Sequence, residues 1–129
     1  MTKVFVYGSL LSGFGNHGLL KTATFLGPAK TPKGFAMLDL GYFPGVIPSD
    51  IHETPILGEV YEVDDETLQR LDRLEGYHKE EPTSGLYRKM DIDTEFGKAT
   101  IYIYNNHYGR GGIVENGDWR SYYPNKVRI

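Results

Sequence analysis

KVFVYGS, residues 3–9, is a compact apolar run that ends in a glycine and a serine. Short apolar runs bounded by turn residues are typical of buried strands. We therefore expect a buried strand from Lys3 to Tyr7 that enters a tight loop at Gly8. Further strands are predicted at 23–29, 35–40, 56–63, 86–93 and 98–104, whereas 41–55 is expected to be a loop with a short extended piece at 46–47.

One helix is well signalled, directly after the predicted strand 56–63. An acidic stretch at 64–66 suits the positive end of a helix dipole, and Leu68, Leu71 and Leu74 then recur on one face. Gly76 can close this helix in the left-handed conformation. Residues 105–129 are rich in Gly, Asn and Tyr and show little periodicity.

These elements fit a small α+β fold. The 129 residues leave room for one hydrophobic core, so we expect a single domain over residues 1–129. Predicted strands outnumber helices and follow one another closely, which favours a largely antiparallel curved sheet or barrel. Repeated βαβ units are missing, which disfavours a doubly wound sheet.

Charge and cysteine content exclude several classes of function. A net charge of −3 gives no general attraction to nucleic acid or to anionic lipid. The chain has no cysteine, which rules out disulfides, thiolate metal sites and a cysteine nucleophile. The first apolar run is too short for a signal peptide or a membrane span, so we expect a cytoplasmic protein.

The glycine-rich segment after the first predicted strand formally contains G-x-G-x-x-G at Gly13–Gly18. A dinucleotide site is disfavoured because this motif lies too far from the strand end and no long helix follows it. A phosphate-binding P-loop is rejected because Phe14 and Gly15 stand where Lys and Ser or Thr are needed. The backbone N–H groups of Gly8, Ser9 and Leu10 remain a candidate site for a carboxylate or an oxyanion, with an ordinary tight turn as the alternative.

Glu75 is the candidate catalytic residue, because it falls at the last turn of the predicted helix. The negative end of the helix dipole and partial burial would both raise the pKa of its carboxyl group. A carboxyl group brought toward neutrality in this way can accept a proton and return it. The alternative is a solvated residue at a helix end, and Asp72 is expected to be a surface or hydrogen-bonded neighbour.

No other constellation of side chains points to a metal or a nucleophile. The four histidines have no paired spacing for a metal, so we expect no metal site and no cofactor. Ser9 lacks the surrounding G-x-S-x-G elbow and any identifiable His or Asp partner. Ten tyrosines are unusual for this length, and they suit either the wall of a small polar pocket or the solvent face of strands.

Several short motifs follow one another along the chain, and each is unspecific by itself. They are Tyr7–Leu10, Asn16, Gly58–Tyr61, Leu71–Tyr77, Tyr87-Arg88, Ala99–Tyr104 and Gly117–Arg120. Taken in this order, they resemble the γ-glutamylcyclotransferase-like family, especially its γ-glutamylamine cyclotransferase branch, and the likeness spans nearly the whole sequence.

The resemblance implies a small mixed β-barrel with flanking helices. It also implies that the loop Tyr7–Leu10 binds substrate and that Glu75 is the catalytic general acid and base. Tyr7, Tyr87 and Tyr104 are expected to be pocket walls.

The predicted activity is conversion of a γ-glutamyl amine or γ-glutamyl amino acid to 5-oxoproline and a free amine. The alternative function is a non-catalytic module that binds or senses a small metabolite in the same cleft. The only partner expected is the small-molecule substrate, and the chain is expected to be a monomer or a weak homodimer. The sequence does not identify the leaving amine.

Overall fold

A computed structural model of the chain describes residues 1–51, 54–105 and 112–126, with side chains described as far as residue 123. His52 and His107, two of the histidines considered above, lie outside the described residues, as do parts of the segments 41–55 and 105–129. The element order is β1(Thr2–Val6), η1(His17–Leu20), β2(Thr24–Lys30), β3(Phe35–Asp39), β4(Pro44–Pro48), β5(Leu57–Val63), α1(Asp65–Leu74), η2(Pro82–Ser84), β6(Tyr87–Thr94), β7(Gly97–Tyr104) and α2(Trp119–Lys126).

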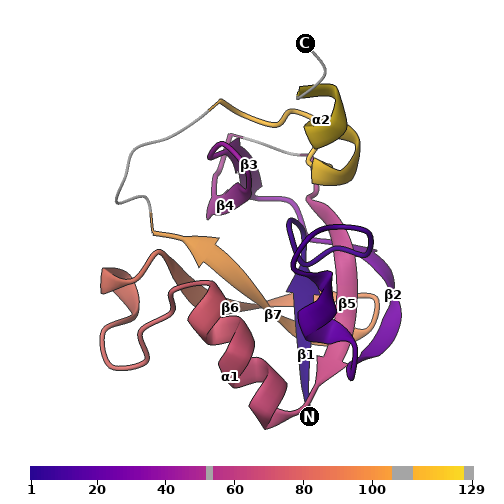
Figure 1. Cartoon of the computed structure of the whole chain (residues 1–129). Coiled ribbons are helices and arrows are strands. Elements are labelled where there is room, and N and C mark those ends of the chain that lie inside the picture. Colours follow the sequence, from indigo (N-terminus) through magenta and orange to yellow (C-terminus); the bar gives the residue numbers. More distant parts are fainter. Residues whose placement is uncertain (52–53, 106–111, 127–129) are drawn as a thin grey trace.

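A five-stranded sheet in the order β2-β5-β1-β7-β6 forms the centre of the molecule (Figure 1). Strand β1 lies in the middle, antiparallel to β5 and parallel to β7. Strands β3 and β4 pair antiparallel in a separate two-stranded sheet. The predicted α+β class with mixed strands and flanking helices is therefore confirmed.

The five-stranded sheet is curved but not closed into a barrel. Strands β2 and β6 are its two edges in the described part of the chain. Curvature nevertheless brings the β6–β7 turn across to β2, where a Cβ atom placed on Gly27 would lie 2.6 Å from the Phe96 ring. The sequence could not reveal this open edge, because closure depends on pairing between strands far apart in the chain.

Apolar residues on both faces of β1 are buried, as the run at the start of the chain predicts. Val4 and Val6 belong to one hydrophobic cluster together with Leu71 of α1. Phe5 and Tyr7 belong to a second cluster, which contains Trp119 of α2. Helices α1 and α2 are therefore each tied to the core by an apolar side chain that is almost fully buried.

Local signals explain the bounds of α1. The Asp64 side chain accepts a hydrogen bond from the Thr67 backbone N–H at 2.8 Å, which is a helix N-cap. Gly76 follows the last turn with a φ of 64°, the left-handed conformation expected for it. Both ends of the helix were predicted from the sequence to within a few residues.

Gly58 is required by the close approach of β5 to β1. A Cβ atom at this position would overlap the Val6 carbonyl oxygen and lie 2.7 Å from the Phe5 ring. Gly58→Ala is therefore expected to lower the free energy of unfolding by about 1–3 kcal/mol, because the strands must shift to admit the methyl group. Urea unfolding measures this change.

Gly15→Ala is the matched control, since a Cβ atom there meets nothing within 4 Å. If Gly58→Ala unfolds at the same urea concentration as Gly15→Ala, the conclusion that the close approach of β5 to β1 requires a glycine at residue 58 is wrong.

Candidate active site

A cavity of about 340 Å³ lies among the loop after β1, the β3–β4 turn, the end of α1 and strands β6 and β7. This volume falls in the range of small-molecule sites. The cavity brings together six of the seven residues that the sequence analysis selected: Tyr7, Gly8, Ser9, Leu10, Glu75 and Tyr87. Residues that are far apart in the chain thus share one concave site.

The loop after β1 lines this cavity and carries backbone donors that are unused within the described residues. The Gly8 carbonyl accepts a hydrogen bond from Leu11 N–H at 2.9 Å, and the Ser9 carbonyl accepts one from Asn16 N–H at 3.0 Å. Among the described residues, no hydrogen bond takes its donor from the N–H of Gly8, Ser9 or Leu10. Consecutive N–H groups of this kind can bind a carboxylate or an oxyanion.

Contacts on both sides hold this loop in place. A Cβ atom on Gly8 would lie 2.7 Å from the Pro44 ring, so glycine lets the β3–β4 turn pack directly against the loop. The Asn16 side-chain amide donates to the Ser9 hydroxyl at 2.9 Å. Asn16 stands at the N-cap position of η1, but its side chain makes no capping hydrogen bond and bonds to the loop instead.

Glu75 is the only residue with a carboxyl side chain that lines the cavity within the described residues. It follows the last residue of α1, and its N–H donates to the Leu71 carbonyl at 2.9 Å. Burial raises the pKa of its carboxyl group from 4.5 to about 7. No hydrogen bond within the described residues reaches this carboxyl group, which can therefore exchange a proton with a bound ligand near neutral pH.

Three tyrosines surround Glu75 and form a rigid, uncharged wall. The hydroxyl of Tyr7 donates to the Tyr102 carbonyl at 2.7 Å, and that of Tyr87 donates to the Pro44 carbonyl at 2.6 Å. Burial, and then the nearby Asp72 carboxylate, raise the pKa of Tyr102, while burial raises the pKa of Tyr7 and Tyr87. All three phenols are therefore neutral hydrogen-bond donors, and none competes with Glu75 as a base.

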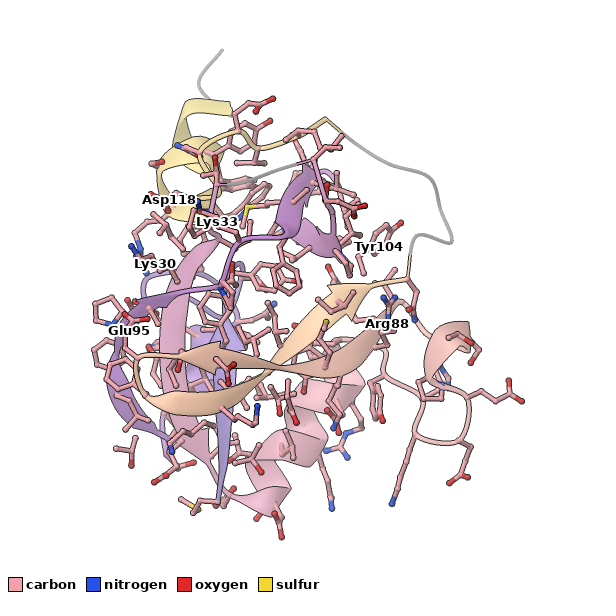
Figure 2. All side chains as sticks on the ribbon, turned by 180° about the vertical axis from the view of Figure 1, so that it is seen from behind. Lys30, Lys33, Arg88, Glu95, Tyr104 and Asp118 are labelled. Carbon is pink, nitrogen blue, oxygen red and sulfur yellow. The ribbon has the colours of Figure 1, made fainter. Side chains whose placement is uncertain are left out.

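Tyr102 lines the cavity, whereas Tyr104 does not. Tyr104 is buried and packs against the Tyr87 ring with 5.9 Å between centroids, and Figure 2 shows it with Arg88 at one end of the β6–β7 hairpin, opposite Glu95 at the turn. Tyr102 and Tyr104 are two residues apart and lie on the same face of β7. Alternation along the strand therefore places both on that face but cannot tell which of them lines the cavity.

Asp72 is a hydrogen-bonded neighbour of the site, as predicted, and does not line the cavity. Its carboxylate accepts from the Tyr102 hydroxyl at 2.6 Å and from Lys89 Nζ at 3.0 Å. Lys89 also lies over the Tyr77 ring, 4.4 Å from its centroid. Both oxygens of Asp72 are thus engaged in holding a wall of the cavity.

In residues 1–51, 54–105 and 112–126, no group of three or more His, Asp or Glu side chains could hold a metal ion. Within the same residues, none of the helices combines the length and the apolar character needed to cross a bilayer.

The chain is similar in sequence to a known protein family and to several of its members. Residues 4–121 match the family model for gamma-glutamyl cyclotransferase, AIG2-like. A Vibrio cholerae protein with the provisional name gamma-glutamylcyclotransferase is 40% identical, over 90% of this chain and 93% of that protein. The gamma-L-glutamyl-butirosin B gamma-glutamyl cyclotransferase of Niallia circulans is 32% identical, over 95% of this chain and 78% of that enzyme.

A solved structure shows the same architecture. The crystal structure of an uncharacterized protein from Pyrococcus horikoshii superposes with a TM-score of 0.78 at 28% identity. The superposition covers 98% of this chain and 96% of the Pyrococcus chain. The likeness in fold therefore extends over nearly the whole length of both proteins.

Proposed function

Because the chain belongs to the gamma-glutamyl cyclotransferase, AIG2-like family, we propose that it converts a γ-glutamyl amine or γ-glutamyl amino acid to 5-oxoproline and a free amine. One observation carries this proposal. Glu75, whose carboxyl group has a pKa of about 7, lines the same small cavity as Gly8, Ser9 and Leu10, whose N–H groups make no hydrogen bond within the described residues. A proton acceptor and an anion site are the two features that the reaction needs.

The first half of the reaction closes the ring. The Glu75 carboxylate removes one proton from the α-ammonium group of the substrate, and the freed amine attacks its own γ-carbonyl carbon. The new N–C bond closes a five-membered ring and places negative charge on the carbonyl oxygen. The N–H groups of Gly8, Ser9 and Leu10 stabilise substrate oxygens, either this oxyanion or the α-carboxylate.

The second half releases the amine. Protonated Glu75 donates its proton to the leaving nitrogen as the original C–N bond breaks, and the oxyanion returns to a carbonyl. The ring nitrogen gives up its second proton to the departing amine, which leaves as an ammonium ion. Because nucleophile and electrophile belong to one molecule, holding the substrate in a folded shape supplies much of the acceleration.

The mouth of the cavity is apolar, which bears on the leaving group. Tyr42 and Phe43 on the β3–β4 turn and Leu74 at the end of α1 line the cavity and are 84%, 37% and 39% exposed. The leaving nitrogen must lie near Glu75, next to Leu74, so its substituent would extend past these side chains. We expect amines with an apolar body to be released faster than amines that carry a carboxylate.

A panel of substrates tests the proposed function. The protein is incubated with γ-glutamyl butylamide, γ-glutamyl lysine and γ-glutamyl alanine, and 5-oxoproline is measured by mass spectrometry. Formation of 5-oxoproline is the expected result, with the butylamide giving the largest kcat/KM. The matched glutaryl amides lack the α-amino group and are expected to give no product.

Other outcomes of the panel point elsewhere. Thermal stabilisation of the protein by these compounds with no product would contradict catalysis and favour the sensing module. If none of the compounds stabilises the protein and none gives a product, both the catalytic and the sensing function are contradicted.

A further inference from the structure

Two of the motifs quoted above have no part in the proposed chemistry, yet they meet in space. Arg120 of α2 donates from Nη1 to the Ser12 carbonyl at 2.6 Å. Its Nη2 donates to the Ser12 hydroxyl and to Glu59 Oε2, both at 3.1 Å. The last helix of the chain is thus bonded to the loop after β1 and to strand β5.

Glu59 accepts two further hydrogen bonds from Ser12. Its Oε1 accepts from the Ser12 backbone N–H at 3.0 Å, and its Oε2 accepts from the Ser12 hydroxyl at 3.0 Å. The Tyr61 hydroxyl also donates to Glu59 Oε1 at 3.1 Å. The Glu59 side chain is only 13% exposed, so its ion pair with Arg120 is partly shielded from water. Ser12 is therefore fixed through its N–H, its carbonyl and its hydroxyl.

Fixing Ser12 also fixes the donors at the cavity. Ser12 follows Gly8, Ser9 and Leu10 in one short loop, which closes on itself through Leu11 N–H to Gly8 O at 2.9 Å and Asn16 N–H to Ser9 O at 3.0 Å. A displacement of Ser12 would be transmitted through these bonds to the backbone of Gly8, Ser9 and Leu10, which line the cavity.

The same helix also holds a second part of the cavity lining, the β3–β4 turn. The Tyr122 hydroxyl donates to Asp39 Oδ2 at 2.7 Å, and Asp39 Oδ1 accepts from Gly41 N–H at 2.8 Å. Leu40 N–H donates to the Phe43 carbonyl at 3.1 Å, which closes the turn that carries the apolar mouth. Tyr122 thereby ties α2 to the β3–β4 turn.

Burial of Trp119 anchors α2, the helix that carries both Arg120 and Tyr122. Its side chain is 1% exposed, and its ring packs against those of Tyr122 and Tyr123, with centroids 5.5 Å and 5.1 Å away. Gly117, just before the helix, has a φ of 64° and is packed so closely against Pro55 that a side chain would overlap its carbonyl oxygen. The helix start is therefore fixed in the core.

We infer that helix α2 positions both of these parts of the cavity lining, with Arg120 and Tyr122 as positioning residues that set the distance between the backbone donors and the β3–β4 turn. Neither residue lines the cavity, so each acts through another residue. The effect on catalysis rests on the proposed function, whereas the effect on the two loops does not.

Amide hydrogen exchange in the free protein tests the positioning directly. Arg120→Met is expected to speed exchange about tenfold at Leu11, Ser12 and Asn16, and Tyr122→Phe to do so at Leu40 and Gly41, because each removes a bond that holds the respective loop. The Val4 amide in the central strand should be unchanged in both variants. Unchanged exchange at all five loop amides would overturn the inference.

Two matched controls keep this test specific. Tyr123→Phe removes a hydroxyl from the same helix that makes no hydrogen bond within the described residues. Arg70→Met removes an arginine of α1 that is paired with Glu66 on the surface, at 2.6 Å. Both are expected to leave exchange in the two loops at the parent rate. Equal acceleration by Tyr123→Phe would mean that any change in α2 loosens the fold, and would also overturn the inference.

Kinetics give the second readout. With the best substrate of the panel, Arg120→Met and Tyr122→Phe are each expected to raise KM roughly 3- to 10-fold while kcat changes less, because substrate contacts are lost and Glu75 is untouched. A parent KM in both variants would contradict the inference even if exchange changes. A parent protein that turns over no member of the panel would contradict the proposed function, and the exchange result would then decide the inference alone.

Discussion

Glu75→Gln is expected to lower kcat for release of 5-oxoproline by about 100- to 10,000-fold, the usual contribution of a general acid and base. Gln has the same shape but can neither take the proton from the α-ammonium group nor return it to the leaving nitrogen. The fold should be retained, because the Glu75 carboxyl group makes no hydrogen bond within the described residues that the substitution would break. Steady-state assays on purified protein measure the loss.

Glu66→Gln is the control for this experiment. Glu66 lies on the same helix, but its side chain is 72% exposed and pairs with Arg70 on the outer surface. It should keep parent activity. The Glu75→Gln protein should still bind substrate that it no longer turns over, and direct titration of the variant with substrate measures this binding. A Glu75→Gln protein that turns over any γ-glutamyl substrate at the parent rate would remove Glu75 from the mechanism.

Much of the fold could be predicted from the sequence because its signals are local. The apolar run at the start gave β1, and the acidic stretch at 64–66 and the left-handed Gly76 marked the two ends of α1. Strands β6 and β7 lie within one residue of the ranges predicted for them. Each of these depends on neighbouring residues, where backbone and side-chain preferences act directly.

Features that depend on distant contacts were not predicted. The parallel pairing of β1 with β7 and the open edge of the sheet follow from pairing between remote strands. Helix α2 shows no helical period in the sequence, and it is held by the burial of Trp119 and by side-chain bonds to Ser12, Glu59 and Asp39. Tertiary contacts of this kind override a weak local preference.

The candidate site divides in the same way. Glu75 stood out through its place at the end of a predicted helix, and the loop from Gly8 through its place after a strand. The resemblance to a known family supplied the expectation that the two work together, and the structure shows them lining one cavity. The choice of Tyr104 over Tyr102 failed to find the cavity wall, because two positions on one strand face look alike without the packing of the β3–β4 turn.

Burial of Glu75 should also make the protein less stable as the pH rises. The carboxyl pKa is about 7 in the folded protein and 4.5 when unperturbed, so the unfolded chain loses its proton first. Below pH 4.5 the group is protonated in both states, and its contribution to stability is complete. Between pH 4.5 and 7 the free energy of unfolding falls by up to about 1.4 kcal/mol per pH unit, and it is level again above pH 7.

The difference between the parent protein and Glu75→Gln isolates this single group, since other titrations are common to both. From pH 4 to pH 8, the parent is expected to lose on the order of 3 kcal/mol relative to Glu75→Gln, measured by urea unfolding at several pH values. Glu66→Gln, whose carboxylate is exposed, should show no comparable trend. A difference that stays constant with pH would mean that the Glu75 carboxylate is as well solvated in the cavity as in the unfolded chain. The proposed ring closure would then lack the proton acceptor it requires, because the free energy that burial costs the fold is the same free energy that brings the carboxyl group into the working pH range.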